Sequence, residues 1–259
     1  MKIDYILPTE IEHKSFEIIT AELDSLGITI PEEEAPITKR VIHTSADFDY
    51  AKTMCYSQGA INLAKELIKN GAHIVTDTNM ALAGINKKKL ASFGGQVHCF
   101  MADEDVAKEA KERQVTRATV SMERAAALPM PVIFAIGNAP TALISLYEMM
   151  EQGKFTPEFV IGVPVGFVNV EAAKELFLNS SVPHIINKGR KGGSNIAAAI
   201  VNALLYSLPP SGERCPEGAD EGMKKGVFHE KRFYHRKLWG GGCEGGDLHA
   251  FVGEGKTEY

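Results

Sequence analysis

The sequence predicts an α/β fold, a doubly wound and mainly parallel sheet of flavodoxin-like or Rossmann-like topology with helices on both faces. Two observations lead to this prediction. Short apolar runs alternate with amphipathic helical stretches, and five such runs are separated by helices. The length of 259 residues is enough for one such domain with an appendage, or for two small domains. Ligands of these folds bind beyond the carboxyl ends of the strands.

A first helix is predicted near the start of the chain. Thr9 and Glu12 have the spacing of a capping box, which starts the helix, and Gly27 ends it. The apolar face of this helix consists of Phe16, Ile19, Leu23 and Leu26. Ser15 lies beside that face, so we expect it at the edge of the buried contact.

A second helix is predicted from about Pro31 to about His43. Arg40 and His43 are three residues apart and therefore share one face of this helix. The polar segment TSADFD follows His43 and is predicted to be a loop at the rim of a site.

Five apolar runs and the helical stretches after them predict the sheet. The runs are HIVTD (73–77), QVHCFMA (96–102), PVIFAIG (131–137), EFVIGVPVGF (158–167) and PHIIN (183–187). The stretches that follow are a short helical segment after the first run, then DEDVAKEAKER, TALISLYEMMEQG, NVEAAKELFLNS and SNIAAAIVNALLYSL. Helices between strands let successive strands run parallel.

Residues 209–259 differ in composition and are predicted to form a glycine-rich C-terminal extension, outside a domain of residues 1–208. Eleven of the 24 glycines lie here, together with the basic and aromatic patch KKGVFHEKRFYHRKLW. We expect this patch to be a solvated or docking surface. A metal clip is the alternative, although the spacing of the candidate ligands fits no standard zinc pattern. These candidates are Cys215, His229, His235, Cys243 and His249.

Composition and charge exclude several classes of protein. The net charge of −5 argues against general nucleic-acid binding and requires a locally basic site for any anionic ligand. No apolar run approaches the roughly 20 residues that span a bilayer, so no membrane association is expected. The four cysteines are scattered and the N-terminus lacks the apolar core of a signal peptide, which favours reduced thiols in the cytoplasm.

Two glycine-rich joints between strands and helices are candidates for anion binding. AIGNAPTAL (135–143) contains Asn138, and NKGRKGGSN (187–195) contains Gly192 and then Ser194, with Asn195 as a second possible helix cap. Both offer backbone N–H groups at a positive helix end, although the glycines could serve only to permit tight turns. Neither joint has the GxGxxG or P-loop spacing, and the chain has no GxSxG or HExxH motif, so no cofactor or metal is predicted.

The residues alone leave three roles open for His43: a structural histidine, a metal ligand or a proton donor. Three features favour the proton donor. His43 lies near a helix C-terminus, where the helix dipole stabilises imidazolium. Arg40 shares its face, which suits an anionic ligand, and a polar loop follows. The pattern therefore predicts an α/β domain that binds a small anion and uses one acid–base histidine.

Five motifs in order resemble the precorrin-8X methylmutase family of cobalamin biosynthesis. They are RVIHTSADF, TDTNMALAGI, AIGNAPTAL, IGVPVGFVNVEAAK and GRKGGSNIAAAIVNALL, and the resemblance covers roughly residues 1–207. It implies a flavodoxin-like three-layer α/β/α sandwich, and a homodimer with active sites at the interface. It also implies an isomerase that moves a methyl group from carbon 11 to carbon 12 of precorrin-8X, or cobalt-precorrin-8, to give hydrogenobyrinate or cobyrinate.

The resemblance also implies roles for individual residues. The family's catalytic histidine falls on His43, and its substrate contacts fall on Ser15, Arg40 and Arg117. Further substrate contacts are expected at Asn138, Gly192 and Ser194, with Arg190 adding positive charge. A sigmatropic methyl shift needs one proton donor and a rigid pocket but no cofactor.

Two alternatives to this function remain. One is a non-catalytic tetrapyrrole carrier with His43 as an axial ligand to cobalt, and the other is a flavin or nicotinamide enzyme on the same fold. The sequence does not indicate whether the tetrapyrrole substrate contains cobalt.

Overall fold

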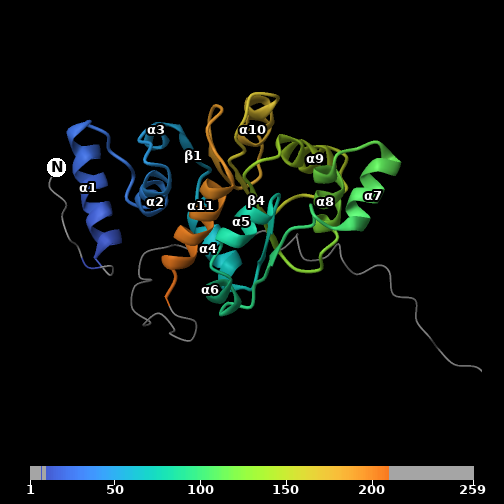
Figure 1. Ribbon diagram of the computed structural model, residues 1–259, viewed down its shortest axis with the longest axis horizontal. Helices are drawn as coiled ribbons and strands as arrows, with labels where there is room; N and C mark the ends of the chain where they lie inside the picture. The colour runs from blue at the N-terminus through green and yellow to red at the C-terminus, as the bar shows by residue number, and fades with distance from the viewer. Residues whose placement is uncertain (1–6, 8–9, 210–259) are drawn as a thin grey trace, which may run out of the picture. The chain divides into compact units, whose positions relative to one another are not determined.

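Six strands form a single mixed sheet in the computed structural model, which describes residue 7 and residues 10–209 (Figure 1). The strand order is β1-β6-β5-β4-β2-β3, and the strands are β1 (Met54–Tyr56), β2 (His73–Thr76), β3 (Val97–His98), β4 (Val132–Ile136), β5 (Phe159–Gly162) and β6 (His184–Asn187). Only β1 is antiparallel to its neighbour. The other five strands have the flavodoxin-like order, which confirms the predicted fold class.

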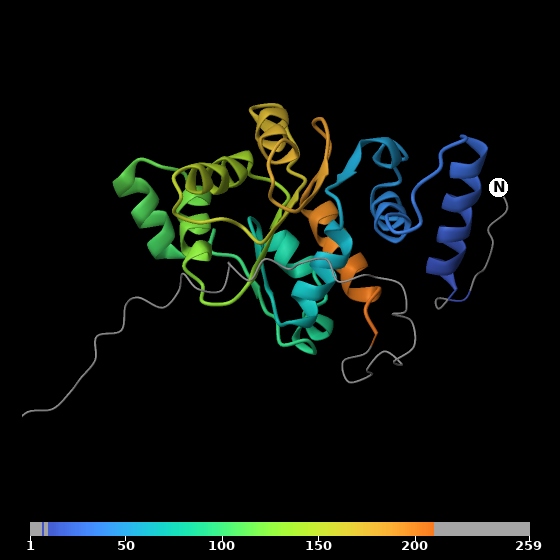
Figure 2. The ribbon, with the colours of Figure 1, turned by 180° about the vertical axis from the view of Figure 1, so that it is seen from behind.

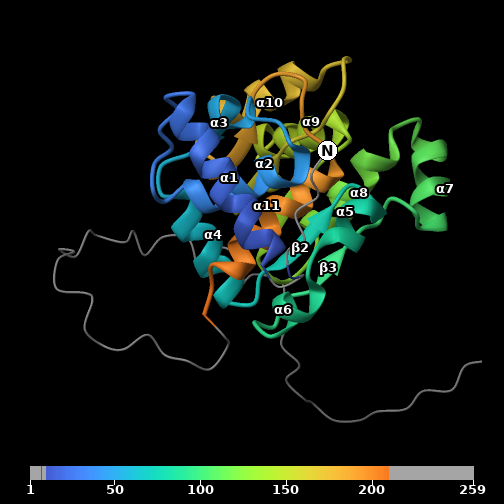
Figure 3. The same ribbon diagram turned by 60° about the vertical axis from the view of Figure 1, so that its left-hand side comes forward.

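Helices cover both faces of this sheet in two layers. One layer contains α2 (Ala35–Ser45), α3 (Tyr50–Thr53), α4 (Ala60–Lys69), α5 (Asn79–Gly84), α6 (Lys87–Ala91) and α11 (Ser194–Tyr206), with α1 (Ile11–Ser25) packed outside α2. The other contains α7 (Glu104–Arg113), α8 (Arg117–Ala126), α9 (Pro140–Glu151) and α10 (Val170–Leu178). Figures 1 and 2 show α1 and α2 at one end of the sheet and α7 and α8 at the other. The two pairs of helices are also separated in the turned view of Figure 3.

Strand β4 explains why the sheet is covered on both sides. Phe134 and Ile136 pack into the core beneath α8, α9 and α10, whereas Ile133 and Ala135 pack into the core beneath α11. Successive side chains of a strand point to opposite faces, so a strand that is apolar at every position must be buried on both. Helix α11 is also apolar nearly all round, because it packs against β4 and β5 of the sheet and against its neighbours α2, α4 and α5 in the same layer.

The structure corrects several predicted boundaries. The second helix begins at Ala35 rather than Pro31, since a longer helix would place Pro36 in its interior, where proline removes a hydrogen bond and clashes. The run 158–167 is a strand only to Gly162, and Pro164 and Gly166, with a φ of +146°, continue as a loop. The run 96–102 contributes only the two residues of β3.

Thr9 of the predicted capping box lies outside the described residues, and the N-cap of α1 is Glu10, whose side chain makes no capping hydrogen bond. Leu26, predicted on the buried face of α1, is 55% exposed because the helix has already ended at Ser25. The sequence prediction also missed β1, α3, α4 and α8.

The predicted extension, including its candidate metal ligands, lies outside the described residues from residue 210 onward, so the boundary after residue 208 stays a prediction. Among the helices that the structure describes, none is long and apolar enough to cross a membrane.

Candidate functional site

His43 lies in the last turn of α2 and faces α1. Its Nδ1 atom is 2.7 Å from the hydroxyl oxygen of Ser15, and its ring stacks on Phe16 with 5.4 Å between the ring centroids. The imidazole is exposed on its remaining side, whereas Ser15 is half-buried at the edge of the α1–α2 contact, as predicted. Two contacts from α1, one with Ser15 and one with Phe16, therefore fix the plane of the ring. The outer edge of the ring stays open to a ligand.

Arg40 also faces α1, which confirms that it shares a helix face with His43. Its guanidinium lies over the rings of Phe16 and Tyr206, at 5.3 and 4.8 Å from their centroids. Glu12 accepts a hydrogen bond from Nη2 at 2.5 Å, and this carboxylate is itself 56% exposed. The aromatic rings hold the cation in place, and the accessible Glu12 carboxylate occupies the position that suits a carboxylate of a ligand.

A cavity of about 590 Å³ opens beside His43, between α1 and α2. Its lining is mostly apolar and consists of Ile11, Lys14, Ser15, Ile18, Ile19, Glu22, Ile42, His43, Ala46 and Phe48. Ile11 and Ile18 are more than half exposed, so apolar surface continues outward from the cavity. Such a lining, with one polar pair at its edge, suits a large and partly apolar ligand.

Asp77 corrects the prediction for the joint 135–143. This carboxylate follows β2, is 1% exposed, and accepts hydrogen bonds from the backbone N–H groups of Gly137, Asn138 and Ala139 at 2.9, 2.7 and 2.5 Å. Burial raises the pKa of Asp77, and the three N–H groups oppose this shift. The expectation that these N–H groups bind an external anion is therefore wrong. The Asn138 side chain remains exposed at this edge.

Ser194 lies nearby, at the first position of α11. Its hydroxyl is 2.7 Å from that of Thr78, which caps α5 by accepting a hydrogen bond from Ala81 N–H. Neither Ser194 nor Asn195 caps α11, since the N-cap is Gly193, so that expectation is wrong too. These residues meet between β2 and β4, where the direction of the strand order reverses and flavodoxin-like folds bind ligands.

Gly192 is required for the close approach of the loop 188–193 to the end of β5. A Cβ atom on Gly192 would lie 2.1 Å from the carbonyl oxygen of Val163, and the backbone there has a φ of +158°. The next residue, Gly193, donates its N–H to that same carbonyl at 2.9 Å. The glycine therefore has a steric reason, independent of any ligand.

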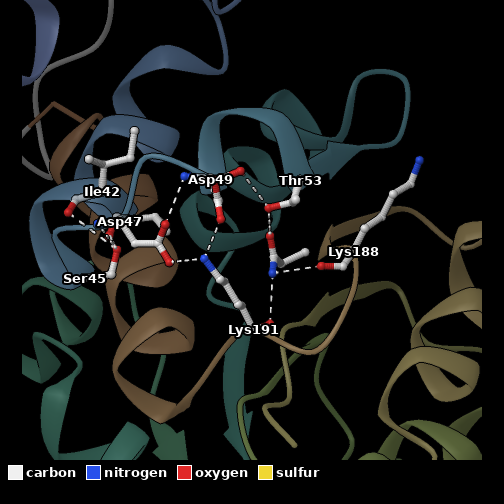
Figure 4. Close-up of polar contacts among 9 residues, drawn as sticks. Ile42, Ser45, Asp47, Asp49, Thr53, Lys188 and Lys191 are labelled. Atoms are coloured by element: carbon white, nitrogen blue, oxygen red, sulfur yellow. Dashed lines mark hydrogen bonds and ion pairs between the residues drawn. The ribbon is translucent and has the colours of Figure 1, made fainter. Parts of the chain in front are cut away.

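A polar network joins this loop to the segment after His43 (Figure 4). Lys191 Nζ lies 2.6 Å from a carboxylate oxygen of Asp47 and 2.6 Å from one of Asp49. Thr53 donates to the side-chain oxygen of Asn187 at 2.6 Å, and the Asn187 amide donates to the carbonyl of Lys191 at 2.9 Å. The loop after β6 and the end of α2 are thus held in a common arrangement.

Arg117 does not join His43 within one chain. It is exposed at the start of α8, in the helix layer on the opposite face of the sheet (Figure 1). Arg190 is exposed as well, and its Nε lies 3.3 Å from Glu171 while its guanidinium stacks on Phe167. The predicted residues therefore form a cluster of Ser15, Arg40 and His43, a second group of Asn138, Gly192 and Ser194 at the sheet edge, and a separate Arg117.

A second and larger cavity, of about 670 Å³, lies between β1, β6 and α10 and contains none of the predicted site residues. Among the described residues, no cluster of three or more histidine, cysteine or acidic side chains is arranged to hold a metal ion.

Sequence reasoning missed Asp77, Glu12, Tyr206 and Lys191. Asp77 had a signal, because the run HIVTD ends on an acidic residue at the carboxyl end of a strand. Glu12 and Tyr206 had none, since they reach Arg40 only through the packing of α1 and α11 against α2.

Taken together, the fold and the site define a flavodoxin-like α/β protein with a histidine–serine pair beside an apolar cavity. The family model described as precorrin-8X methylmutase matches residues 10–207. The chain belongs to the precorrin-8X methylmutase family and is an isomerase of cobalamin biosynthesis.

Individual relatives are also named as methylmutases. The cobalt-precorrin-8 methylmutase of Priestia megaterium is 43% identical over 199 residues, 77% of this chain and 88% of the relative. That of Salmonella typhimurium is 43% identical over 209 residues, 78% of this chain and 96% of the relative. The crystal structure of precorrin-8x methyl mutase from Thermus thermophilus has a TM-score of 0.69 at 36% identity, and the match covers 76% of this chain and 96% of that one.

Proposed function

We propose that this isomerase moves a methyl group from carbon 11 to carbon 12 of precorrin-8X or cobalt-precorrin-8 and forms hydrogenobyrinate or cobyrinate. The observation that carries the proposal is the His43–Ser15 pair at the edge of the apolar cavity, with Arg40 on the same helix face. The substrate is a large conjugated ring with carboxylate side chains, so it needs an apolar surface, a proton donor and fixed cations.

His43 acts as the proton donor. As imidazolium it donates Nδ1–H to Ser15 and has Nε2–H available for the macrocycle. Protonation draws electron density from the ring, the bond from carbon 11 to the methyl group breaks, and the bond from carbon 12 to the methyl group forms. The proton then returns to the protein or solvent, because substrate and product are isomers.

Arg40 binds one substrate carboxylate. Its position is fixed by Phe16 and Tyr206, and an incoming carboxylate displaces or shares the exposed partner Glu12. The remaining proposed contacts lie at the carboxyl ends of the strands and come from the Asn138 side chain, Gly192 and Ser194. Binding there fixes the orientation of the substrate ring relative to His43.

The active form is a homodimer in the cytoplasm with its sites at the interface. Support comes from the position of Arg117, which lies in the helix layer opposite to that of His43. One substrate molecule can contact both residues when Arg117 comes from a second copy of the chain. The cavity beside His43, at about 590 Å³, is also open on its outer side, where exposed Ile11 and Ile18 offer apolar surface to a partner.

The test is incubation of the purified full-length protein with precorrin-8X and, separately, with cobalt-precorrin-8, followed by identification of the product. Formation of hydrogenobyrinate or cobyrinate supports the proposal and shows which substrate is preferred. A bound tetrapyrrole whose spectrum shifts without rearrangement would contradict it and would indicate a carrier with His43 as an axial ligand.

A further inference from the structure

Lys174 is a buried cation on α10 that the proposed reaction does not use. Its residue is 1% exposed, and its Nζ donates hydrogen bonds to the backbone carbonyls of Gly189 and Lys191 at 2.7 and 2.8 Å. Among the described residues no carboxylate lies within ion-pair distance of this ammonium group. Burial lowers the pKa of Lys174 to about 8, and the charge of Glu171 opposes this shift.

Such a residue is costly for folding, because a buried charge without a paired carboxylate loses its hydration. An apolar side chain would fill the same space at lower cost. Lys174 therefore calls for a reason beyond packing, and its two hydrogen-bond acceptors indicate where that reason lies.

Both acceptors belong to the loop 188–193, which we call the cationic loop because it carries Lys188, Arg190 and Lys191. The two carbonyls turn inward to Lys174, while the three charged side chains are exposed. Figure 4 shows the Lys188 side chain extending away from the network. One ammonium group thus fixes the inner side of the loop. On the outer side Arg190 pairs with Glu171 and Lys191 pairs with Asp47 and Asp49, whereas Lys188 has no carboxylate partner among the described residues and is the cation open to a ligand.

The same loop is tied to the helix that carries His43. Lys191, whose carbonyl accepts from Lys174, pairs through its side chain with Asp47 and Asp49, which follow α2. The loop contains Gly192 and continues directly into Ser194, the first residue of α11. A change in the loop therefore alters the position of its cations relative to the end of α2.

We infer that Lys174 is a positioning residue for substrate binding: its hydrogen bonds to Gly189 and Lys191 shape the cationic loop so that it receives carboxylates of the tetrapyrrole. This inference rests on the proposed function and adds a residue that does not touch the substrate. Charge-assisted hydrogen bonds of this kind are worth enough that loss of both would weaken binding by about tenfold or more.

The experiment compares Lys174→Met and Lys174→Gln in the full-length protein with the wild type. Lys174→Met removes the donors, and Lys174→Gln keeps a polar head with two N–H groups. Glu175→Gln is the matched control, because Glu175 is an exposed residue of the same helix and lines the same cavity of about 670 Å³ as Lys174. KM and kcat are measured with precorrin-8X or cobalt-precorrin-8, and the Kd of the product is measured by absorbance titration.

We expect KM and the product Kd to rise about tenfold in Lys174→Met, kcat to change by less than about threefold, Lys174→Gln to be intermediate and Glu175→Gln to be unchanged. An unchanged KM in folded Lys174→Met overturns the inference, as does a fall in kcat at constant KM. If neither Lys174 variant unfolds cooperatively, Lys174 is needed for the fold itself and the positioning role is wrong. A wild-type protein that converts neither substrate refutes the proposed function instead, and this is seen before any variant is compared.

Discussion

The hydroxyl oxygen of Ser15 lies 2.7 Å from Nδ1 of His43, across the contact between α1 and α2. In the proposed reaction, Nδ1 of His43 stays hydrogen-bonded to Ser15 while Nε2 exchanges a proton with the ligand. Among the described residues, no hydrogen bond engages Nε2. The pair therefore sets the orientation of the imidazole and leaves Nε2 open to a ligand.

His43→Ala is expected to lower kcat by about 10²- to 10⁴-fold, because proton transfer by a positioned side chain contributes this much. Binding of the macrocycle should be retained, since Arg40 and the apolar cavity are unchanged. Steady-state kinetics and product titration measure the two effects separately. Near-full turnover in this variant would show that His43 is structural.

Ser15→Ala is expected to lower kcat by about tenfold while KM changes little, because one hydrogen bond that orients the ring is lost. Ser15→Thr keeps a hydroxyl and serves as the control. If Ser15→Ala and Ser15→Thr lower kcat equally, the hydroxyl does not orient His43, and the effect on kcat comes from the changed volume of the side chain.

Arg40→Ala is expected to raise KM by about tenfold or more, with a smaller effect on kcat, because a fixed cation for a carboxylate is removed. Glu12→Gln is the informative comparison, since it removes the charge that competes for Arg40 and should leave KM unchanged or lower it. Both values come from the same kinetic assay. An unchanged substrate affinity in Arg40→Ala would remove Arg40 from the site.

The pair of His73 and His98 is expected to make the folded protein less stable at acidic pH. The two rings share a hydrogen bond of 2.7 Å between Nδ1 of His73 and Nε2 of His98, and burial lowers the pKa of both. A lowered histidine pKa means that the unfolded chain binds more protons than the folded one below about pH 6.5, so stability falls as pH falls.

We therefore expect the thermal midpoint to decrease between pH 7 and pH 5, and to decrease less in His98→Asn, whose amide can still form a hydrogen bond with His73. Differential scanning calorimetry across this pH range measures both slopes. Equal slopes in the two proteins would assign the acid sensitivity to other groups.

Deletion of residues 211–259 is expected to leave the fold and methyl transfer largely intact. Residues 211–259 lie outside both the described residues and the matched range of 10–207. Circular dichroism and the kinetic assay on the truncated protein test this expectation. A truncated protein that unfolds, or that folds and is inactive, would make the extension part of the catalytic unit, and zinc or cobalt lost on truncation would favour the metal clip.

The fold was predictable because hydrophobic pattern decides it. The five apolar runs each contain a strand. Strands β2, β4, β5 and β6 are buried at every position, as expected of parallel strands covered on both faces, whereas β3 at the edge is half-buried. Strand β1 escaped prediction because Met54–Tyr56 has only three residues and is half-buried at the edge of the sheet, where it pairs antiparallel with β6.

The site was predictable only where its residues are close in sequence. The three-residue spacing of Arg40 and His43 placed them on one helix face, and the structure confirms this placement. The hydrogen bonds from the backbone N–H groups of residues 137–139 to Asp77 were not predicted. They depend on the register of β2 beside β4, which the sequence does not reveal. The buried partners of Lys174 depend in the same way on how α10 packs against the loop after β6.

The most direct test of the central claim, a site shared between two chains with His43 as its acid, uses two inactivating variants in one dimer. Chains carrying His43→Ala and chains carrying Arg117→Ala are co-expressed with different affinity tags, and the mixed dimers are isolated and assayed. If the two residues act in one site from different chains, each mixed dimer has one intact site, and its kcat/KM should be about half that of the wild type. Activity in the mixed dimers no higher than the average of the two variant homodimers would contradict the account.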